Sequence, residues 1–228
     1  MSEGTGLKAE SYIGSLIGAR EVNQDAWLAE AERLVFAVAD GVGGGLRGEV
    51  ASAMAISVIK EKVFKATDLR SSFNQAQAAI FKEAMEVHGE PIMGTTLTAG
   101  LIEGNFLYIC HVGDSRCYCF REGQLILLTE DQDYYDDNLE SSVLSSYLGI
   151  PTEEFVLKIF EEKFPLKSQD KLLFCTDGLH RQLEDPRIVE IMRGYASDSA
   201  CIVKELSQQA TASSQHSDNV TLVLVDLV

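Results

Sequence analysis

Residues 34–41, LVFAVADG, form an apolar run that ends in Asp-Gly. A second run of this kind, residues 172–178, LLFCTDG, also ends in Asp-Gly, and Asp218-Asn219 opens a third run, VTLVLV. Runs that are apolar on both faces indicate buried strands, and a glycine lets backbone or a ligand approach closely. Carboxylates at the ends of three such strands could converge on a hard cation such as Mg²⁺ or Mn²⁺.

Helical periodicity predicts two helices after the first run and two more before the last, over residues 49–65, 68–88, 186–193 and 199–212. Alternating or apolar runs predict the strands, over residues 11–17, 25–29, 34–39, 95–102, 106–112, 116–120, 124–128, 154–160, 171–176 and 220–227. The acidic, polar stretch 130–146 is interpreted as a mobile surface segment. Strands and helices do not alternate regularly, so a doubly wound parallel sheet is disfavoured. We expect an α+β fold of antiparallel sheets with helix pairs outside them.

The length, composition and net charge of the chain restrict the class of protein. No linker rich in proline, glycine or serine divides the 228 residues, so we expect one domain over 1–228. The formal net charge of −16, without a basic stripe, argues against nucleic-acid binding. No apolar stretch approaches the roughly 20 residues of a membrane span, and the first residues do not resemble a signal peptide. Five cysteines, an odd number, favour reduced thiols in the cytoplasm.

Six motifs follow one another along the chain: RxxNQD at 20–25, DGVGGxxxGExAS at 40–52, GTT at 94–96, VGDSR at 112–116, DGL at 177–179 and DNVT at 218–221. In this order they resemble the metal-dependent serine/threonine protein phosphatases, the PPM or type 2C family, in their compact bacterial form. The resemblance covers nearly the whole chain. It implies a four-layer αββα sandwich, in which two antiparallel sheets lie between helix pairs.

The resemblance also implies roles for individual residues around two Mn²⁺ or Mg²⁺ ions. Asp40 corresponds to the aspartate that bridges the ions, and Arg20 to the arginine that binds substrate phosphate. The remaining ligand positions fall on Asp25, which acts directly or through water, on the Gly41 carbonyl, and on Asp177 and Asp218. Two ions can activate a water and neutralise the phosphoryl oxygens, and the planar fork of arginine suits a phosphate dianion.

Some positions depart from the family pattern. Asp114 corresponds to an aspartate that helps to hold a weak third ion, but His180-Arg181 stands where another acid is often found. Asp114 could instead form an ion pair with Arg116 that stabilises the turn between two strands. The flap that opens near residue 130 is short and acidic, and should alter substrate selection and metal occupancy. Val42 stands where larger relatives carry a histidine that acts as general acid.

Several features have both a structural and a functional interpretation. His111 is expected to be a core residue, whereas His180 could approach the pocket and His216 could support Asp218. The glycine turn 43–45 is interpreted as a permissive turn near the metals, because it lacks the lysine and threonine of a phosphate-binding P-loop.

The leading hypothesis is hydrolysis of phosphoserine and phosphothreonine in proteins by a metal-bridging water. Its partners would be phosphorylated proteins and a cognate serine/threonine kinase, and the chain is expected to act as a monomer without inserting into a membrane. The alternative is a catalytically weak regulatory module of the same fold that binds phosphoproteins. A phosphohydrolase with a covalent phospho-aspartate is disfavoured, because that chemistry expects its Asp-x-Asp nucleophile motif on a parallel α/β sheet, and a parallel sheet is not expected here.

Overall fold

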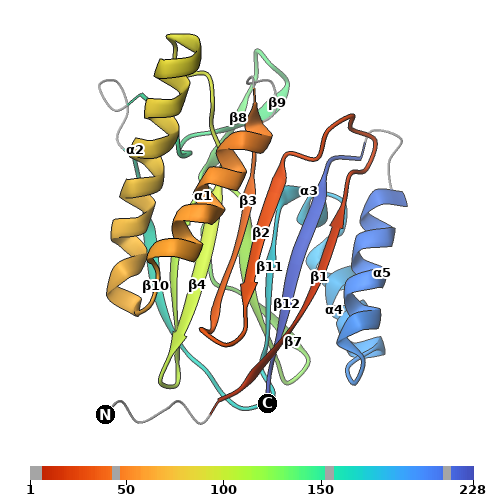
Figure 1. Cartoon of the computed structure of the whole chain (residues 1–228). Helices are drawn as coiled ribbons and strands as arrows, with labels where there is room; N and C mark the ends of the chain where they lie inside the picture. The colour runs from red at the N-terminus through yellow and green to blue at the C-terminus, as the bar shows by residue number, and fades with distance from the viewer. Residues whose placement is uncertain (1–6, 43–46, 152–156, 213–216) are drawn as a thin grey trace.

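A computed structural model describes residues 7–42, 47–151, 157–212 and 217–228. Two five-stranded sheets are stacked between two groups of helices (Figure 1). All strand pairs in both sheets are antiparallel. The predicted α+β sandwich is therefore confirmed.

The first sheet has the strand order β1 (Ala9–Leu16), β12 (Val220–Leu227), β11 (Lys171–Cys175), β6 (Arg116–Arg121) and β7 (Gln124–Leu127). The second has the order β10 (Phe160–Pro165), β5 (Phe106–Val112), β4 (Leu97–Glu103), β3 (Val35–Asp40) and β2 (Asp25–Glu30). Helices α1 (Gly48–Lys62) and α2 (Leu69–His88), joined through the short 3₁₀ helix η1 (Ala66–Asp68), cover the second sheet. Helices α3 (Asp177–His180), α4 (Asp185–Gly194) and α5 (Ser199–Ala212) lie on the side of the first sheet.

The central strands are apolar throughout because each contributes to two cores. In β3, Val35, Ala37 and Ala39 pack under α1 and α2, whereas Phe36 and Val38 pack between the sheets. In β11 and β12, alternate residues divide in the same way between the inter-sheet core and the core beneath α4 and α5. The rings of Phe36 and Phe174 meet across the sheets with centroids 6.4 Å apart. The three runs identified in the sequence thus form the middle of the sandwich.

The motif residues meet at one end of the sandwich. Strand β3 ends there at Asp40, and β11 ends beside the start of its antiparallel partner β12. The backbone N–H of Thr176 donates to the Thr221 carbonyl at 2.9 Å, which joins these two strand ends. In Figure 1 this is the end near β8 and β9, away from the labelled termini.

Two predicted segments differ from the structure. The acidic stretch 130–146, expected to be a mobile surface segment, contains an antiparallel hairpin of β8 (Asp133–Asp136) and β9 (Ser141–Leu144). The strand predicted over 154–160 was wrong for residues 157–159, because β10 begins at Phe160; residues 154–156 lie outside the described ranges. As an edge strand, β10 carries Glu161, Glu162 and Lys163, so its sequence lacks the apolar run of a central strand. Among the described residues, no helix is both long and apolar enough to span a bilayer.

Candidate active site

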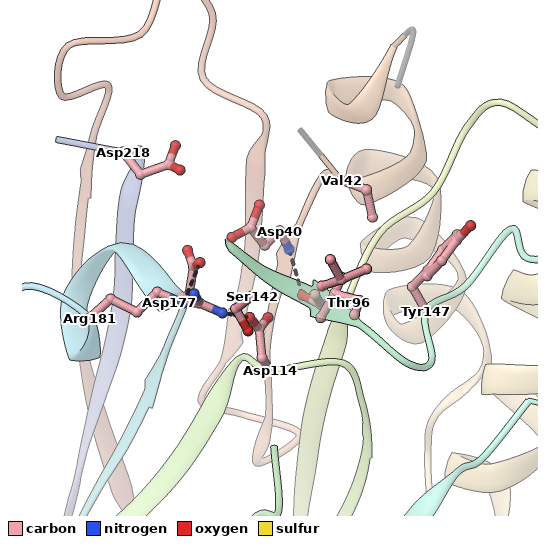
Figure 2. A pocket seen from close by; sticks show the side chains of 11 residues that line it. Asp40, Val42, Thr96, Asp114, Ser142, Tyr147, Asp177, Arg181 and Asp218 are labelled. Atoms are coloured by element: carbon pink, nitrogen blue, oxygen red, sulfur yellow. Dashed lines mark hydrogen bonds and ion pairs between the residues drawn. The ribbon is translucent and has the colours of Figure 1, made fainter. Parts of the chain in front are cut away.

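A pocket of about 450 Å³ opens at the motif-bearing end of the sandwich (Figure 2). Its walls come from both sheets, from α3 and from the β8–β9 hairpin. It is lined by Asp40, Val42, Thr96, Asp114, Ser142, Val143, Leu144, Tyr147, Asp177, Arg181 and Asp218. Four of the predicted metal-binding aspartates therefore share one cavity.

The backbone of Asp40 is fixed by the Gly-Thr-Thr motif. The Asp40 N–H donates to Thr96 Oγ1 at 2.9 Å, and its carbonyl accepts from the Thr96 N–H and the Thr95 hydroxyl, each at 2.8 Å. A side chain at Gly41 would meet the backbone of Gly48 at 2.4 Å, so this position requires a glycine. The strand end thus presents Asp40 to the pocket while α1 approaches closely from behind.

Asp25 lies beside Asp40, because the two residues are directly paired in the register of β2 and β3. The Thr176 hydroxyl donates to Asp25 Oδ2 at 2.9 Å. The other oxygen, Oδ1, is buried and has no hydrogen-bond partner within the described part of the chain. Burial, above all, raises the pKa of Asp25 to about 7, although the hydroxyls of Thr221 and Thr176 favour its ionised form.

Asp177 begins α3, and Asp218 stands just before β12. A side chain at Gly178 would meet the Asn219 carbonyl at 2.0 Å, so the second Asp-Gly also permits a close backbone approach. Asp177 Oδ1 is buried and, among the residues described, has no hydrogen-bond partner. The side-chain oxygen Oδ1 of Asn219 accepts a hydrogen bond from the Gln24 N–H at 2.8 Å, which fixes the loop before β2 against the start of β12.

Arg20 lies outside the residues that line the pocket. Its Nη2 contacts Asp218 Oδ2 at 2.6 Å, and its side chain is 51% exposed. The structure thus places the predicted phosphate-binding arginine against a predicted metal ligand. Its role toward phosphate stays a prediction.

Asp114 is 4% exposed and pairs with Arg181, whose Nη2 lies 2.7 Å from Asp114 Oδ2. The alternative pairing with Arg116 was wrong, because Arg116 makes its ion pair with Asp131 at 2.7 Å. Burial raises the pKa of Asp114 to about 6, with a further contribution from Asp177, whereas Arg181 opposes the rise.

The histidines differ in how close they lie to the site. His111 is fully buried between the Thr98 hydroxyl and the Glu130 carbonyl, and burial lowers its pKa to about 4, as expected for a core residue. His180 reaches the site indirectly, since its Nε2 lies 2.9 Å from the Asp114 carbonyl. His216 and the glycine turn 43–45 lie outside the described residues.

The donor atoms at this site suit a hard divalent cation. Burial and the neighbouring carboxylates of Asp25 and Asp177 hold the pKa of Asp40 well above its usual range. Bound cations would relieve this crowding and give the orphaned oxygens of Asp25 and Asp177 a partner. Within the described ranges, no three acidic, histidine or cysteine side chains already form a metal-binding group. The chemistry of the oxygen donors, rather than a closed cage, is what fits Mn²⁺ or Mg²⁺.

Sequence reasoning did not assign the pocket wall formed by Ser142, Val143, Leu144 and Tyr147. The only available signal was the short, acidic flap that opens near residue 130. The contacts of Arg181 were also missed, because nothing in the sequence indicates which acids it meets.

Comparisons with known proteins bear on the family and the fold of this chain. The family model described as protein phosphatase 2C matches residues 15–215. The serine/threonine protein phosphatase PstP of Mycobacterium tuberculosis is 31% identical over 92% of this chain, and the match spans 43% of the length of PstP. A serine/threonine phosphatase of Listeria welshimeri is 28% identical, with 83% of this chain and 82% of the relative covered. The solved catalytic domain of PstP in complex with two manganese ions superposes with a TM-score of 0.81, at 28% identity, covering 97% of this chain and 99% of that one.

Proposed function

The chain belongs to the protein phosphatase 2C family, and on that premise we propose that it is a Mn²⁺- or Mg²⁺-dependent phosphatase that hydrolyses phosphoserine and phosphothreonine in proteins. The observation that carries the proposal is the convergence of Asp25, Asp40 and Asp177 at one end of the sandwich. Two of these side chains have a buried oxygen without a hydrogen-bond partner among the described residues. The PstP catalytic domain, which is similar over nearly its whole length, is a complex with two manganese ions.

In this proposal Asp40 would contribute to holding both ions, Asp177 and Asp218 would hold the first, and the Gly41 carbonyl would hold the second. Asp25 supports the centre directly or through water, and the Thr176 hydroxyl holds Asp25 in its orientation. When bound, the ions supply an acidified water and neutralise charge on the phosphoryl oxygens. Metal loading requires ionised carboxylates, so protons are released as the site fills.

We assign the substrate phosphate to Arg20, whose side chain is half exposed and pairs with Asp218, a residue of the pocket lining. On substrate binding, the Arg20 guanidinium would leave Asp218 and pair with the phosphate dianion, which can accept two parallel hydrogen bonds from it. Val42 lines the pocket and has no proton to give. The leaving alkoxide therefore takes its proton from water or another group.

The substrates, partner and location follow from the same chemistry. Phosphoserine and phosphothreonine in proteins are made by kinases, so a serine/threonine kinase with shared substrates is the proposed functional partner. We infer a cytoplasmic location from the five cysteines, all of which are free thiols. A monomer is sufficient for the proposed activity, because one chain supplies all the assigned residues.

The test is hydrolysis of a phosphothreonine peptide across a Mn²⁺ titration, with wild type, Asp40→Asn and a matched control. Asp198→Asn is that control, because Asp198 caps α5 far from the pocket and asparagine caps a helix equally well. We expect metal-dependent turnover in wild type and control, and a loss of at least about 100-fold in Asp40→Asn, since even supporting residues of metal sites cost 10–100-fold. Folded wild type that binds Mn²⁺ and the peptide without turnover would instead favour the regulatory module.

A further inference from the structure

Arg181 contacts three carboxylates that come from three separate elements. Its Nη2 lies 2.7 Å from Asp114 Oδ2 and 3.1 Å from Asp133 Oδ2, and its Nε lies 3.0 Å from Asp177 Oδ2. Asp114 belongs to the corner between β5 and β6, Asp133 begins β8, and Asp177 begins α3. Figure 2 shows the Arg181 side chain extending from α3 between Asp177 and Asp114.

The three carboxylates around Arg181 favour a positive charge among them. Asp114 is 4% exposed, and the side chains of Asp133 and Asp177 are 24% and 20% exposed. Three carboxylates this poorly solvated repel one another, and a positive charge among them offsets that repulsion. With Arg181 in place, these three carboxylates do not form a metal-binding group, although carboxylate oxygens are the donors that hard divalent cations take. The guanidinium supplies the positive charge instead, and it does not lose its proton in proteins.

We propose that Arg181 is a built-in cation that occupies the space among Asp114, Asp133 and Asp177, so that this side of the pocket does not bind a further divalent ion. The inference rests on the proposed two-metal function and refines it. Asp114 then serves as an anchor for Arg181 rather than as a metal ligand.

The same contacts hold one wall of the pocket. Asp133 also accepts a hydrogen bond from the Ser142 hydroxyl across the β8–β9 hairpin. Ser142 lines the pocket together with Leu144. At the base of the hairpin, the Gln132 N–H donates to the Gly113 carbonyl at 2.8 Å. Arg181 is thus a positioning residue that connects α3 to the hairpin through Asp133.

The test counts bound Mn²⁺ per chain by equilibrium dialysis with elemental analysis. The samples are wild type, Arg181→Ala, Arg181→Ala with Asp133→Asn, and Arg187→Ala. Arg187 lies on α4, away from the pocket, where it pairs with Glu190. Its replacement changes the net charge by the same amount as Arg181→Ala, so it controls for ions attracted by the acidic surface.

We expect two tightly bound ions in wild type and in Arg187→Ala. Arg181→Ala should gain one ion, and the added Asp133→Asn should remove it again. An unchanged count in folded Arg181→Ala overturns the inference. A wild-type count of three also overturns the inference, and this outcome needs no variant.

A kinetic readout tests the positioning role. Freeing the hairpin should raise the KM for a phosphothreonine peptide several-fold in Arg181→Ala, with a smaller change in the KM for p-nitrophenyl phosphate, which lacks the peptide chain that the hairpin would position. Equal changes for both substrates would contradict this role. A wild type that binds no Mn²⁺ and has no turnover refutes the proposed function itself, whereas an active two-metal wild type with an unchanged variant count refutes only the role of Arg181.

Discussion

Asp25 is the residue at which burial and function oppose each other most clearly. Its carboxylate is held by Thr176, lies beside Asp40 and keeps one oxygen without a partner in the described part of the chain. Without metal, the protonated form is favoured, and burial raises the pKa of Asp25 to about 7 from an ordinary value of 3.8. The site is therefore arranged for a charge that the metal-free protein does not stabilise.

This shift predicts how the stability of the metal-free protein depends on pH. Between pH 3.8 and about 7, the folded protein keeps a proton on Asp25 that the unfolded chain has lost. The free energy of unfolding should therefore fall as the pH rises through this window. One pKa unit corresponds to about 1.4 kcal/mol. The fall in the free energy of unfolding that Asp25 causes across this window is therefore on the order of a few kcal/mol.

The measurement is urea unfolding with EDTA at several pH values from 5 to 8. Asp25→Asn cannot titrate, so its stability should fall less steeply than that of wild type. Arg187→Ala, which lies away from the pocket, should keep the wild-type slope. Parallel curves for Asp25→Asn and wild type would contradict the raised pKa.

At the scale of the elements, the packing between the sheets depends on a glycine in β4. A side chain at Gly100 would meet the Phe174 ring at 2.7 Å and a methyl of Leu107 at 2.9 Å. Both neighbours are fully buried, so neither has free space into which to move. Gly100→Ala should therefore destabilise the fold by roughly 1–3 kcal/mol through overpacking.

Gly194 provides the matched control. It ends α4, and an added side chain there would meet nothing within 4 Å. Gly194→Ala should leave stability unchanged or raise it by up to about 1 kcal/mol, because alanine is the better helix former. Urea unfolding of both variants at one pH checks the pair, and an equal effect of the two substitutions would count against the packing argument.

The elements that the sequence predicts well are those buried inside the sandwich. The central strands were predictable because both faces are buried, so that stretches such as 34–39 and 172–175 are apolar throughout. The β8–β9 hairpin could not be predicted in this way. Asp133 and Ser142 join its strands through a polar contact, which gives the sequence no alternation of apolar and polar residues. The same distinction applies to the site. Its Asp-Gly pairs are marked by the strands that they end, whereas Arg181 gains its partners only when three distant segments meet.

At the scale of the whole molecule, the balance of 19 basic and 35 acidic residues gives a net charge of −16. Self-repulsion at this charge opposes the compact state, and salt screens it without regard to position. Divalent ions bound in the pocket should act more specifically, because they bind the folded site and not the unfolded chain. Their stabilisation therefore depends on the occupancy of the site as well as on ionic strength.

We accordingly expect Mn²⁺ to raise the midpoint of thermal unfolding, relative to the same protein in EDTA at equal ionic strength. At 100 times its dissociation constant, one bound ion contributes about 2.7 kcal/mol. The double variant Asp40→Asn with Asp177→Asn should lose most of this response while keeping its response to NaCl. If Mn²⁺ raised the midpoint of this variant as much as that of wild type, the ion would be acting on the acidic surface, and the dinuclear centre would have to be abandoned. The comparison thus separates the general effect of charge on this protein from the specific effect of its pocket.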